Sequence, residues 1–297
     1  MSFNDIFDDN TVLSIASFNE PNDLLSLALT CKRLGSKFGS ATSREWRKMI
    51  RDAKRQKAGD LRDWSLMEEA ARCIMERSLT DEERASLPLL DGENWIGRYN
   101  ELMLLRRPLS FDQLVGDVVY PSNDKSVMTI RGDCSSMSDH VMRAGKHYAT
   151  FTVSGVDYAY NISICVLRPI KGWNEKGYSL KRARNSDTEL LQERNERWGD
   201  GNVHYCTYFI SDGSCVWSDF AGDIEVGTDL NVPGVERSNV VGMLLDLDEG
   251  TLAVYVNGRR QGVIKDGLTG DYCWGTETNW TWNGTPSVEI ERGQIPV

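Results

Sequence analysis

Three closely spaced carboxylates, Asp246, Asp248 and Glu249, are the first candidates for chemistry in this sequence. Two carboxylic acids that face each other across a cleft can hydrolyse a glycosidic bond. Here, however, Asp248 and Glu249 precede Gly250, and acidic residues followed by glycine between two apolar runs are typical of a tight turn. Turn formation accounts for these acids without catalysis. A carbohydrate-active, lectin-like enzyme is kept as an alternative, and it requires two opposed carboxylates.

The other residue types that do chemistry are scattered. The sequence has seven cysteines and three histidines, and no two cysteines have the Cys-x-x-Cys spacing of a zinc or redox site. Neither a Gly-x-Ser-x-Gly motif nor a phosphate-binding glycine loop occurs. We therefore expect a non-catalytic protein that uses no metal and no other cofactor.

The cysteines and the start of the chain bear on where the protein works. An odd number of cysteines without paired spacing favours reduced, buried thiols. The first ten residues, MSFNDIFDDN, lack the basic and apolar regions of a signal peptide. We expect a protein of the cytoplasm, the nucleus or both.

The charge excludes some partners. A net charge of −10 argues against nucleic acid, because neutralising phosphates needs clustered Lys and Arg. No apolar stretch is long enough to span a membrane. A local exception runs from Arg44 to Lys57, where seven basic residues stand against Glu45 and Asp52. This predicted basic helix suits an acidic partner, RNA, a membrane surface or simply solvent.

The hydrophobic period changes along the chain. From Asp5 to about Leu105 the apolar residues recur at helical spacing. From Phe111 onward they alternate, and turn residues interrupt them about every eight to twelve positions, as in an all-β domain. The pattern predicts an α+β multidomain fold, with a helical module at 1–45, a helical connector at 46–107 and an antiparallel β-sandwich at 108–297.

Individual strands follow from the alternation. We predict strands at 146–154, 161–167, 203–210 and 240–247. After the turn at 248–250, Leu252, Val254 and Val256 alternate. Asn257 and Gly258 then suit a type I′ turn, whose two central residues both need positive φ. The region from 240 onward is therefore predicted to be a β-meander.

This meander carries a resemblance to a known family. VVGMLLDLDEGTLAVYVNGRRQGV at 240–263 resembles the signature segment of SPRY domains. MRAGKHYATFTVSG at 142–155, NISICVLRP at 161–169 and SVEIERG at 287–293 are similar to other SPRY strands, in the same order. The resemblance covers 108–297. It implies a β-sandwich that binds a peptide or protein target through loops at one end and catalyses nothing.

Aromatic residues in the predicted loops are the candidates for binding this target. Tryptophan suits binding hot spots because it buries a large area with few rotatable bonds. The loops at 120–125, 173–178, 217–222 and 272–282 supply Tyr120, Trp173, Trp217, Trp274, Trp280 and Trp282. At least one of the last three tryptophans is expected in the core of the sandwich instead.

The predicted helical module has more apolar surface than it can bury. Leu24, Leu27 and Cys31 lie on one face of a helix, while Leu25 and Leu29 form a second apolar strip on another side. A module of about 45 residues cannot enclose both strips. Either the rest of the chain or a partner protein must cover the excess.

The same module resembles an F-box. The match runs from Phe3 to Gly39, is best at DLLSLALTCKRL (23–34), and includes a later Trp46. At the start, where F-boxes have Leu-Pro-x-Glu, this chain has Phe7 and two aspartates instead. The resemblance implies docking on a Skp-type adaptor, and through it on a cullin. The implied contact residues are Phe7, Val12, Leu13, Leu24, Leu25 and Leu29.

Together the two resemblances imply a substrate receptor of an SCF-type cullin–RING ubiquitin ligase. The F-box-like helices would hold the adaptor, and the SPRY loops would hold an unknown target. The alternative is a SPRY interaction protein whose helices recruit no ligase, in which case Leu25 and Leu29 are buried within the chain.

Overall fold

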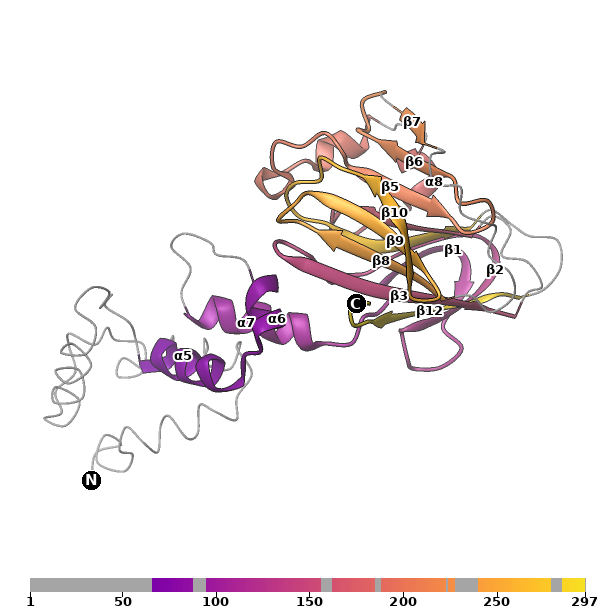
Figure 1. Cartoon of the computed structure of the whole chain (residues 1–297). Coiled ribbons are helices and arrows are strands. Elements are labelled where there is room, and N and C mark those ends of the chain that lie inside the picture. Colours follow the sequence, from indigo (N-terminus) through magenta and orange to yellow (C-terminus); the bar gives the residue numbers. More distant parts are fainter. Residues whose placement is uncertain are drawn as a thin grey trace, which may run out of the picture. The chain divides into compact units, whose positions relative to one another are not determined.

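The computed structural model describes residues 66–87, 95–155, 162–184, 188–222, 224–227, 240–278 and 285–296 (Figure 1). The chain divides into two compact units, Met1–Arg107 and Pro108–Val297. The F-box-like segment and the basic segment from Arg44 to Lys57 lie outside the described residues. In the described part, no helix is long and apolar enough to cross a membrane.

The described part of the first unit is helical, as the periodicity predicts. It contains α5 (Leu66–Ser78), α6 (Asp81–Ser86) and α7 (Trp95–Arg106). Helices α5 and α7 pack against each other and bury Ala71, Met75, Ile96, Tyr99 and Leu102. These residues recur every three or four positions, so each helix has one apolar side.

A capping box and an ion pair hold the short helix α6 in place. The Thr80 hydroxyl accepts a hydrogen bond from the Glu83 backbone N–H, and the Glu83 carboxylate accepts one from the Thr80 N–H. Arg106 at the end of α7 donates to both Glu83 oxygens, at 2.7 and 2.9 Å, and to the Ser78 carbonyl at 2.6 Å. One guanidinium therefore joins the ends of all three helices.

The second unit consists mainly of antiparallel strands. Its first strands are β1 (Gln113–Val119), β2 (Val127–Met137), β3 (Lys146–Ser154), β4 (Ile162–Leu167), β5 (Tyr205–Phe209) and β6 (Cys215–Ser218). The others are β7 (Ile224–Gly227), β8 (Val240–Asp246), β9 (Thr251–Val256), β10 (Arg259–Lys265), β11 (Cys273–Thr278) and β12 (Ser287–Arg292). Between β4 and β5 lie a short helix, α8 (Leu180–Arg184), and two 3₁₀ turns, η3 (Leu190–Glu193) and η4 (Glu196–Trp198).

The predicted meander is confirmed. Strands β8, β9 and β10 pair in sequence, and Asn257 and Gly258 have φ values of 50° and 75°. Both values are positive, as a type I′ turn requires. The predicted strand at 146–154 coincides with β3, whereas the strand predicted at 203–210 is shorter, because only Tyr205–Phe209 pair as β5.

The described strands form one sheet that bends into two layers. Long strand β2 pairs through residues 127–129 with β12, and through residues 134–137 with β11, so it passes from one layer to the other. The layers meet across the core, where Phe151 of β3 lies edge-on to Trp274 of β11, with ring centroids 6.1 Å apart. At the far ends of the sheet, Lys265 Nζ of β10 lies 4.2 Å from the ring centroid of Trp217 of β6. The result is an antiparallel sandwich.

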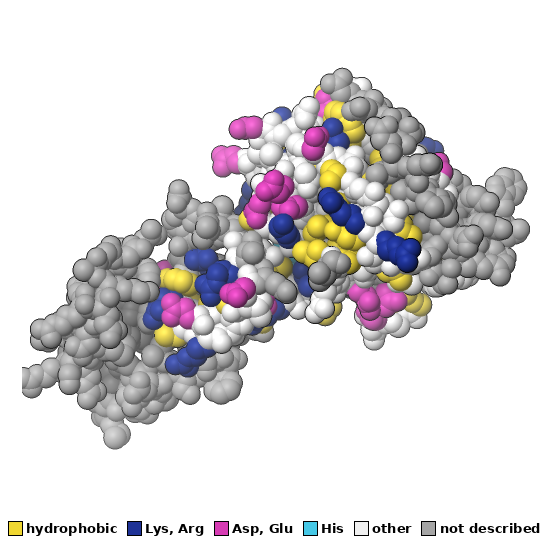
Figure 2. Space-filling view, viewed as in Figure 1, with side chains coloured by type: hydrophobic (Ala, Val, Ile, Leu, Met, Phe, Trp, Pro, Cys, Tyr) yellow, Lys and Arg dark blue, Asp and Glu magenta, His cyan; other side chains and the backbone are white. Residues whose placement is uncertain are grey.

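One row of side chains on the outer side of the sheet is apolar. The register aligns Val263 with Ala253, Ala253 with Leu244, and Leu244 with Tyr148, across β10, β9, β8 and β3. Figure 2 shows hydrophobic side chains over this sheet, with Lys and Arg side chains beside them. Val263 is 43% exposed and the other three are largely covered.

A second cluster of apolar residues lies on the opposite side of β4, β5 and β11 from the main core. The sequence from 171 to 200 is polar on average and longer than an ordinary loop, but four of its large apolar residues are fully buried there. They are Trp173, Leu180, Leu190 and Trp198. Spaced along the connection, these anchors hold it against the sheet, and this brings its polar residues to one end of the sandwich.

Candidate binding site

The acidic residues at 246–249 form a structural turn. Asp246 Oδ1 accepts hydrogen bonds from the backbone N–H groups of Asp248 and Glu249, at 3.2 and 3.1 Å. Its Oδ2 pairs with Lys146 Nζ at 3.0 Å. Asp248 Oδ1 in turn accepts from the Gly145 N–H at 3.1 Å. Both acids are thus used to close the β8–β9 turn onto the start of β3.

Five of the described thiols, those of Cys134, Cys165, Cys206, Cys215 and Cys273, lie in the interior, as do two of the three imidazoles. Burial raises the pKa of Cys134 and Cys215 to about 12. Burial also lowers the pKa of His147 and of His204 to about 4. These thiols are therefore protonated and the two imidazoles neutral near pH 7. In the described residues, no group of three or more His, Cys, Asp or Glu side chains is arranged to hold a metal.

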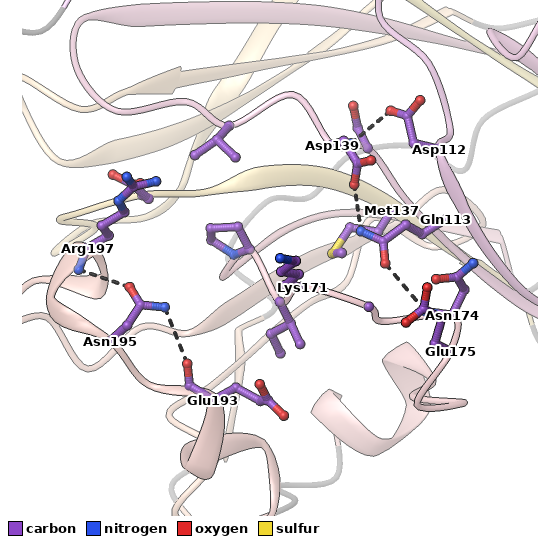
Figure 3. Close-up of a pocket in the computed structure, with 16 residues that line it drawn as sticks. Asp112, Gln113, Met137, Asp139, Lys171, Asn174, Glu175, Glu193, Asn195 and Arg197 are labelled. Atoms are coloured by element: carbon purple, nitrogen blue, oxygen red, sulfur yellow. Dashed lines mark hydrogen bonds between the residues drawn. The ribbon is translucent and has the colours of Figure 1, made fainter. Parts of the chain in front are cut away.

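A surface pocket of about 570 Å³ lies at one end of the sandwich (Figure 3). Strands β1 and β11 begin there, and β2 and β4 end there. Neighbouring antiparallel strands bring their starts and ends to the same edge, which explains how distant segments meet. The lining residues are Asp112, Gln113, Met137, Ser138, Asp139, Val141, Pro169, Ile170, Lys171, Gly172, Asn174, Glu175, Glu193, Asn195, Arg197 and Asp271.

Hydrogen bonds preorganise the first wall of this pocket. Asp112 Oδ2 accepts from the Asp139 N–H at 2.9 Å, and Asp139 Oδ1 accepts from Gln113 Nε2 at 2.6 Å. The Gln113 side-chain oxygen then accepts from the Asn174 N–H at 3.4 Å. Figure 3 shows this chain running along one side of the pocket. It ties β1, β2 and the connection after β4 together.

The second wall comes from η3, η4 and the approach to β11. Asn195 Oδ1 accepts from the Arg197 N–H at 3.0 Å, and the Arg197 carbonyl accepts from the Asp271 N–H at 2.8 Å. Glu193 pairs with Lys176 Nζ at 2.6 Å. Figure 3 shows Lys171 between the two walls. Met137, Val141, Pro169 and Ile170 add apolar surface, so the pocket offers both hydrogen-bonding groups and a hydrophobic lining.

Asp271 is the most enclosed acid of the pocket. Asp271 is 7% exposed, and Arg143 Nε lies 3.5 Å from the Asp271 Oδ2 atom. Burial raises the pKa of its carboxyl, while the charges of Arg143, Arg197 and Arg168 oppose this rise. The carboxylate is therefore held among cations, and its side chain belongs to both the pocket and the interior.

The structure places two of the predicted target-binding tryptophans in the interior. Trp173 is 0% exposed and packs edge-on to Tyr178, and Trp274 is 1% exposed inside the sandwich. Because both rings are enclosed, neither offers a surface to a target. The buried Trp173 side chain instead fixes this part of the backbone, and the residues next to it in the chain, Gly172 and Asn174, line the pocket.

The other predicted target-binding residues are distributed. Tyr120 is half-buried, donates its hydroxyl hydrogen to the Phe111 carbonyl and has Lys125 over its ring. Trp217 of β6 is half-buried, and Lys265 of β10 lies over its ring. Trp280 and Trp282 lie outside the described residues. Asn174 and Glu175 of the predicted loop at 173–178 line the pocket, and the predicted loop at 272–282 begins directly after the lining residue Asp271.

The residues that do line the pocket were absent from the sequence prediction. Asp112, Asp139, Asn195 and Arg197 are ordinary polar residues in turn-like surroundings, with no distinctive motif. Asp112 precedes β1 and Asp139 follows β2, and neither of these strands was among those predicted from the sequence. Trp173 was predicted at a binding surface but is enclosed, because a large ring is as useful in a core as in a binding surface. The buried Trp274 agrees with the expectation that at least one of the last three tryptophans lies in the core.

No protein-family model matches the sequence, and no curated protein sequence matches it. Among solved structures, the SPRY domain of human HERC1 is similar, with a TM-score of 0.41 and 12% identity over 63% of this chain and 98% of that chain. The TRIM65 PSpry domain has a TM-score of 0.40 and 16% identity over 64% and 95%. The carbohydrate-binding module CBM66 from Bacillus subtilis has a TM-score of 0.33 and 10% identity over 55% and 86%. At such identities each likeness is one of fold alone.

Proposed function

We propose that this chain is a non-catalytic recognition protein whose SPRY-like β unit binds a segment of another protein in the pocket at the end of the sandwich. The observation that supports this most directly is the preorganised first wall, in which Asp112, Asp139 and Gln113 are already hydrogen-bonded to one another. Binding groups held in place before the ligand arrives lose little conformational entropy on association.

The size and lining of the pocket suit a short peptide segment. A volume of about 570 Å³ accommodates a few side chains. Polar groups on two walls can fix the direction of a backbone, while Val141, Pro169 and Ile170 offer apolar contact. A carbohydrate would also find hydrogen bonds here, and it is the competing ligand that the experiment below excludes or reveals.

The test uses a random nonapeptide display library selected on the immobilised full chain. Asn174 lines the pocket with an exposed side chain, so Asn174→Trp fills the pocket with little effect on the core. We expect selected peptides to bind this variant at least about tenfold more weakly, a loss of about 1.4 kcal/mol. Binding of synthetic copies is measured by fluorescence polarisation.

The matched control is Gln192→Trp, which adds the same ring at an exposed position outside the pocket lining. It should leave binding unchanged. If no selected peptide distinguishes Asn174→Trp from the control, the pocket does not bind peptides and the proposal is wrong. A parallel glycan array on the same variants shows whether sugars use the pocket instead.

We further propose that residues 1–45 dock on a Skp-type adaptor, so that the chain serves as a substrate receptor of a cullin–RING ubiquitin ligase in the cytoplasm or nucleus. Support comes from the F-box-like segment and from the second apolar strip formed by Leu25 and Leu29. An apolar strip that the helical module cannot bury within itself is suited to contact with a partner protein.

A pull-down of purified Skp-type adaptor tests this second proposal. We expect the full chain to retain the adaptor and Leu25→Asp/Leu29→Asp to lose it, because two buried charges in an apolar interface are costly. Circular dichroism must show that the variant keeps its helix content. Lys32→Asp/Arg33→Asp, on the same predicted helix, controls for the added charge. If the wild-type chain retains no adaptor, the helices extend an interaction protein that recruits no ligase.

A further inference from the structure

The charges in the pocket are unevenly compensated. Five lining residues are acidic, namely Asp112, Asp139, Glu175, Glu193 and Asp271, whereas only Lys171 and Arg197 are basic. Glu193 already pairs with Lys176, and Asp271 lies among arginines. The first wall is different, because its carboxylates are held by neutral groups.

The neutral partners on this wall are specific. Asp112 accepts from the Ser110 hydroxyl at 3.0 Å and from the Asp139 N–H. Asp139 accepts from the Gln113 amide. These bonds orient the carboxylates but add no positive charge. The pKa of the Tyr120 phenol is raised, mainly by burial and in addition by the negative charges of Asp112 and Asp139. The wall therefore presents two fixed negative charges to whatever enters the pocket.

A second observation on the pocket also points to a donor-rich ligand. Asp271 is more than nine-tenths buried and lines the pocket, and its Oδ2 accepts no hydrogen bond from the described residues. Arg143 Nε, 3.5 Å away, is an ion-pair neighbour without a hydrogen bond to it. A buried carboxylate oxygen without a donor is costly, so an N–H group supplied by a ligand would be favourable here.

We propose that the segment bound in the pocket carries an arginine or lysine side chain, which is received by Asp112 and Asp139. This inference rests on the proposed function, and it adds the chemistry of the partner. A guanidinium has five N–H donors in a planar fork, enough to reach carboxylates in pairs, and an ammonium has three. The adjacent apolar lining suits the aliphatic stem of either side chain.

The experiment extends the peptide selection to a charge-neutral first wall. Asp112→Asn/Asp139→Asn keeps the shape and an acceptor oxygen at each position, but removes both charges. We expect pocket-dependent peptides to be enriched in Arg and Lys over the starting library. We also expect them to bind the double variant at least about tenfold more weakly, as for the loss of a charge-assisted hydrogen bond.

The matched control removes two negative charges elsewhere. Asp248→Asn/Glu249→Gln lies in the β8–β9 turn, outside the pocket lining, and should leave binding unchanged. If peptides depend on the pocket but are not enriched in Arg or Lys, or bind the first-wall variant normally, the inference is wrong while the proposed function stands. If no peptide responds to Asn174→Trp, the proposed function fails and the inference fails with it.

Discussion

Replacing Arg168 with methionine is expected to lower the free energy of unfolding of the β unit by about 3–4 kcal/mol. Arg168 follows β4, is 0% exposed, and joins segments that are distant in the sequence. Its Nη1 donates to the Thr269 carbonyl at 2.6 Å and to the Asp271 carbonyl at 3.1 Å. Its Nε donates to His204 Nδ1 at 3.3 Å.

The size of this effect follows from what methionine leaves behind. Two buried acceptors, the Asp271 carbonyl and His204 Nδ1, lose their donor, and each unsatisfied buried acceptor costs about 1–3 kcal/mol. The Thr269 carbonyl also loses its donor, but Thr269 is exposed, so water can replace that bond at a lower cost. The guanidinium also lies 4.1 Å from the ring centroid of Tyr272, a cation–π contact that methionine cannot make. Against this, burial lowers the pKa of Arg168, which shows that enclosing the charge has a cost that the variant avoids. The net loss is therefore smaller than the sum of the separate contacts.

Native-state hydrogen exchange of amides in β3 and β8 measures this loss within the β unit alone. The control is Arg194→Met, because Arg194 is exposed and its side chain makes one hydrogen bond to the described residues, to the Gly199 carbonyl at 3.2 Å. It should cost less than about 0.5 kcal/mol. Equal stability of the two variants would contradict the role of Arg168. Arg168→Lys is expected to recover little, because an ammonium lacks the planar fork.

Replacing Gly270 with alanine is expected to cost about 3 kcal/mol and to disturb the second wall of the pocket. Gly270 has a φ of 78°, and a Cβ atom there would lie 2.4 Å from the carbonyl oxygen of Trp198. It would also lie 2.7 Å from the carbonyl oxygen of Arg197. Both are backbone atoms, so a side-chain rotation cannot relieve the overlap. The 195–198 turn has to move away from the 267–271 loop.

Gly267 provides a control in the same loop. Its φ is 73°, but a Cβ there would meet no atom within 4 Å. Gly267→Ala should therefore show only the cost of a left-handed backbone, about 1–2 kcal/mol. The difference between the two variants isolates the close approach. Hydrogen exchange of the 190–204 and 266–273 peptides reports it, and similar exchange in both variants would show that the turn is not packed as described.

Local features of the sequence predicted much of the β unit. The meander from β8 to β10 is encoded by alternation and by the Asn257–Gly258 turn, both of which act over neighbouring residues. The turn at Asp248 and Glu249 was also readable, because acidic residues followed by glycine between two apolar runs are typical of a tight turn. Strands β3 and β4 were recognised in the same way. In each case the deciding interaction is short in sequence.

The tertiary structure alone decided which residues form the pocket that is the candidate site. The pocket collects residues from near 112, 139, 171, 195 and 271, and no local pattern indicates that strands β1, β2, β4 and β11 share one edge. Burial of Trp173 and Trp274 could not be told from exposure, because an aromatic ring is favourable in either place. Composition also gave no sign that Arg168 would be fully enclosed, since its partners at 204, 269 and 271 are brought close only when the sheet folds. Such long-range packing, and not the propensity of any single segment, determines where the charges of the pocket face.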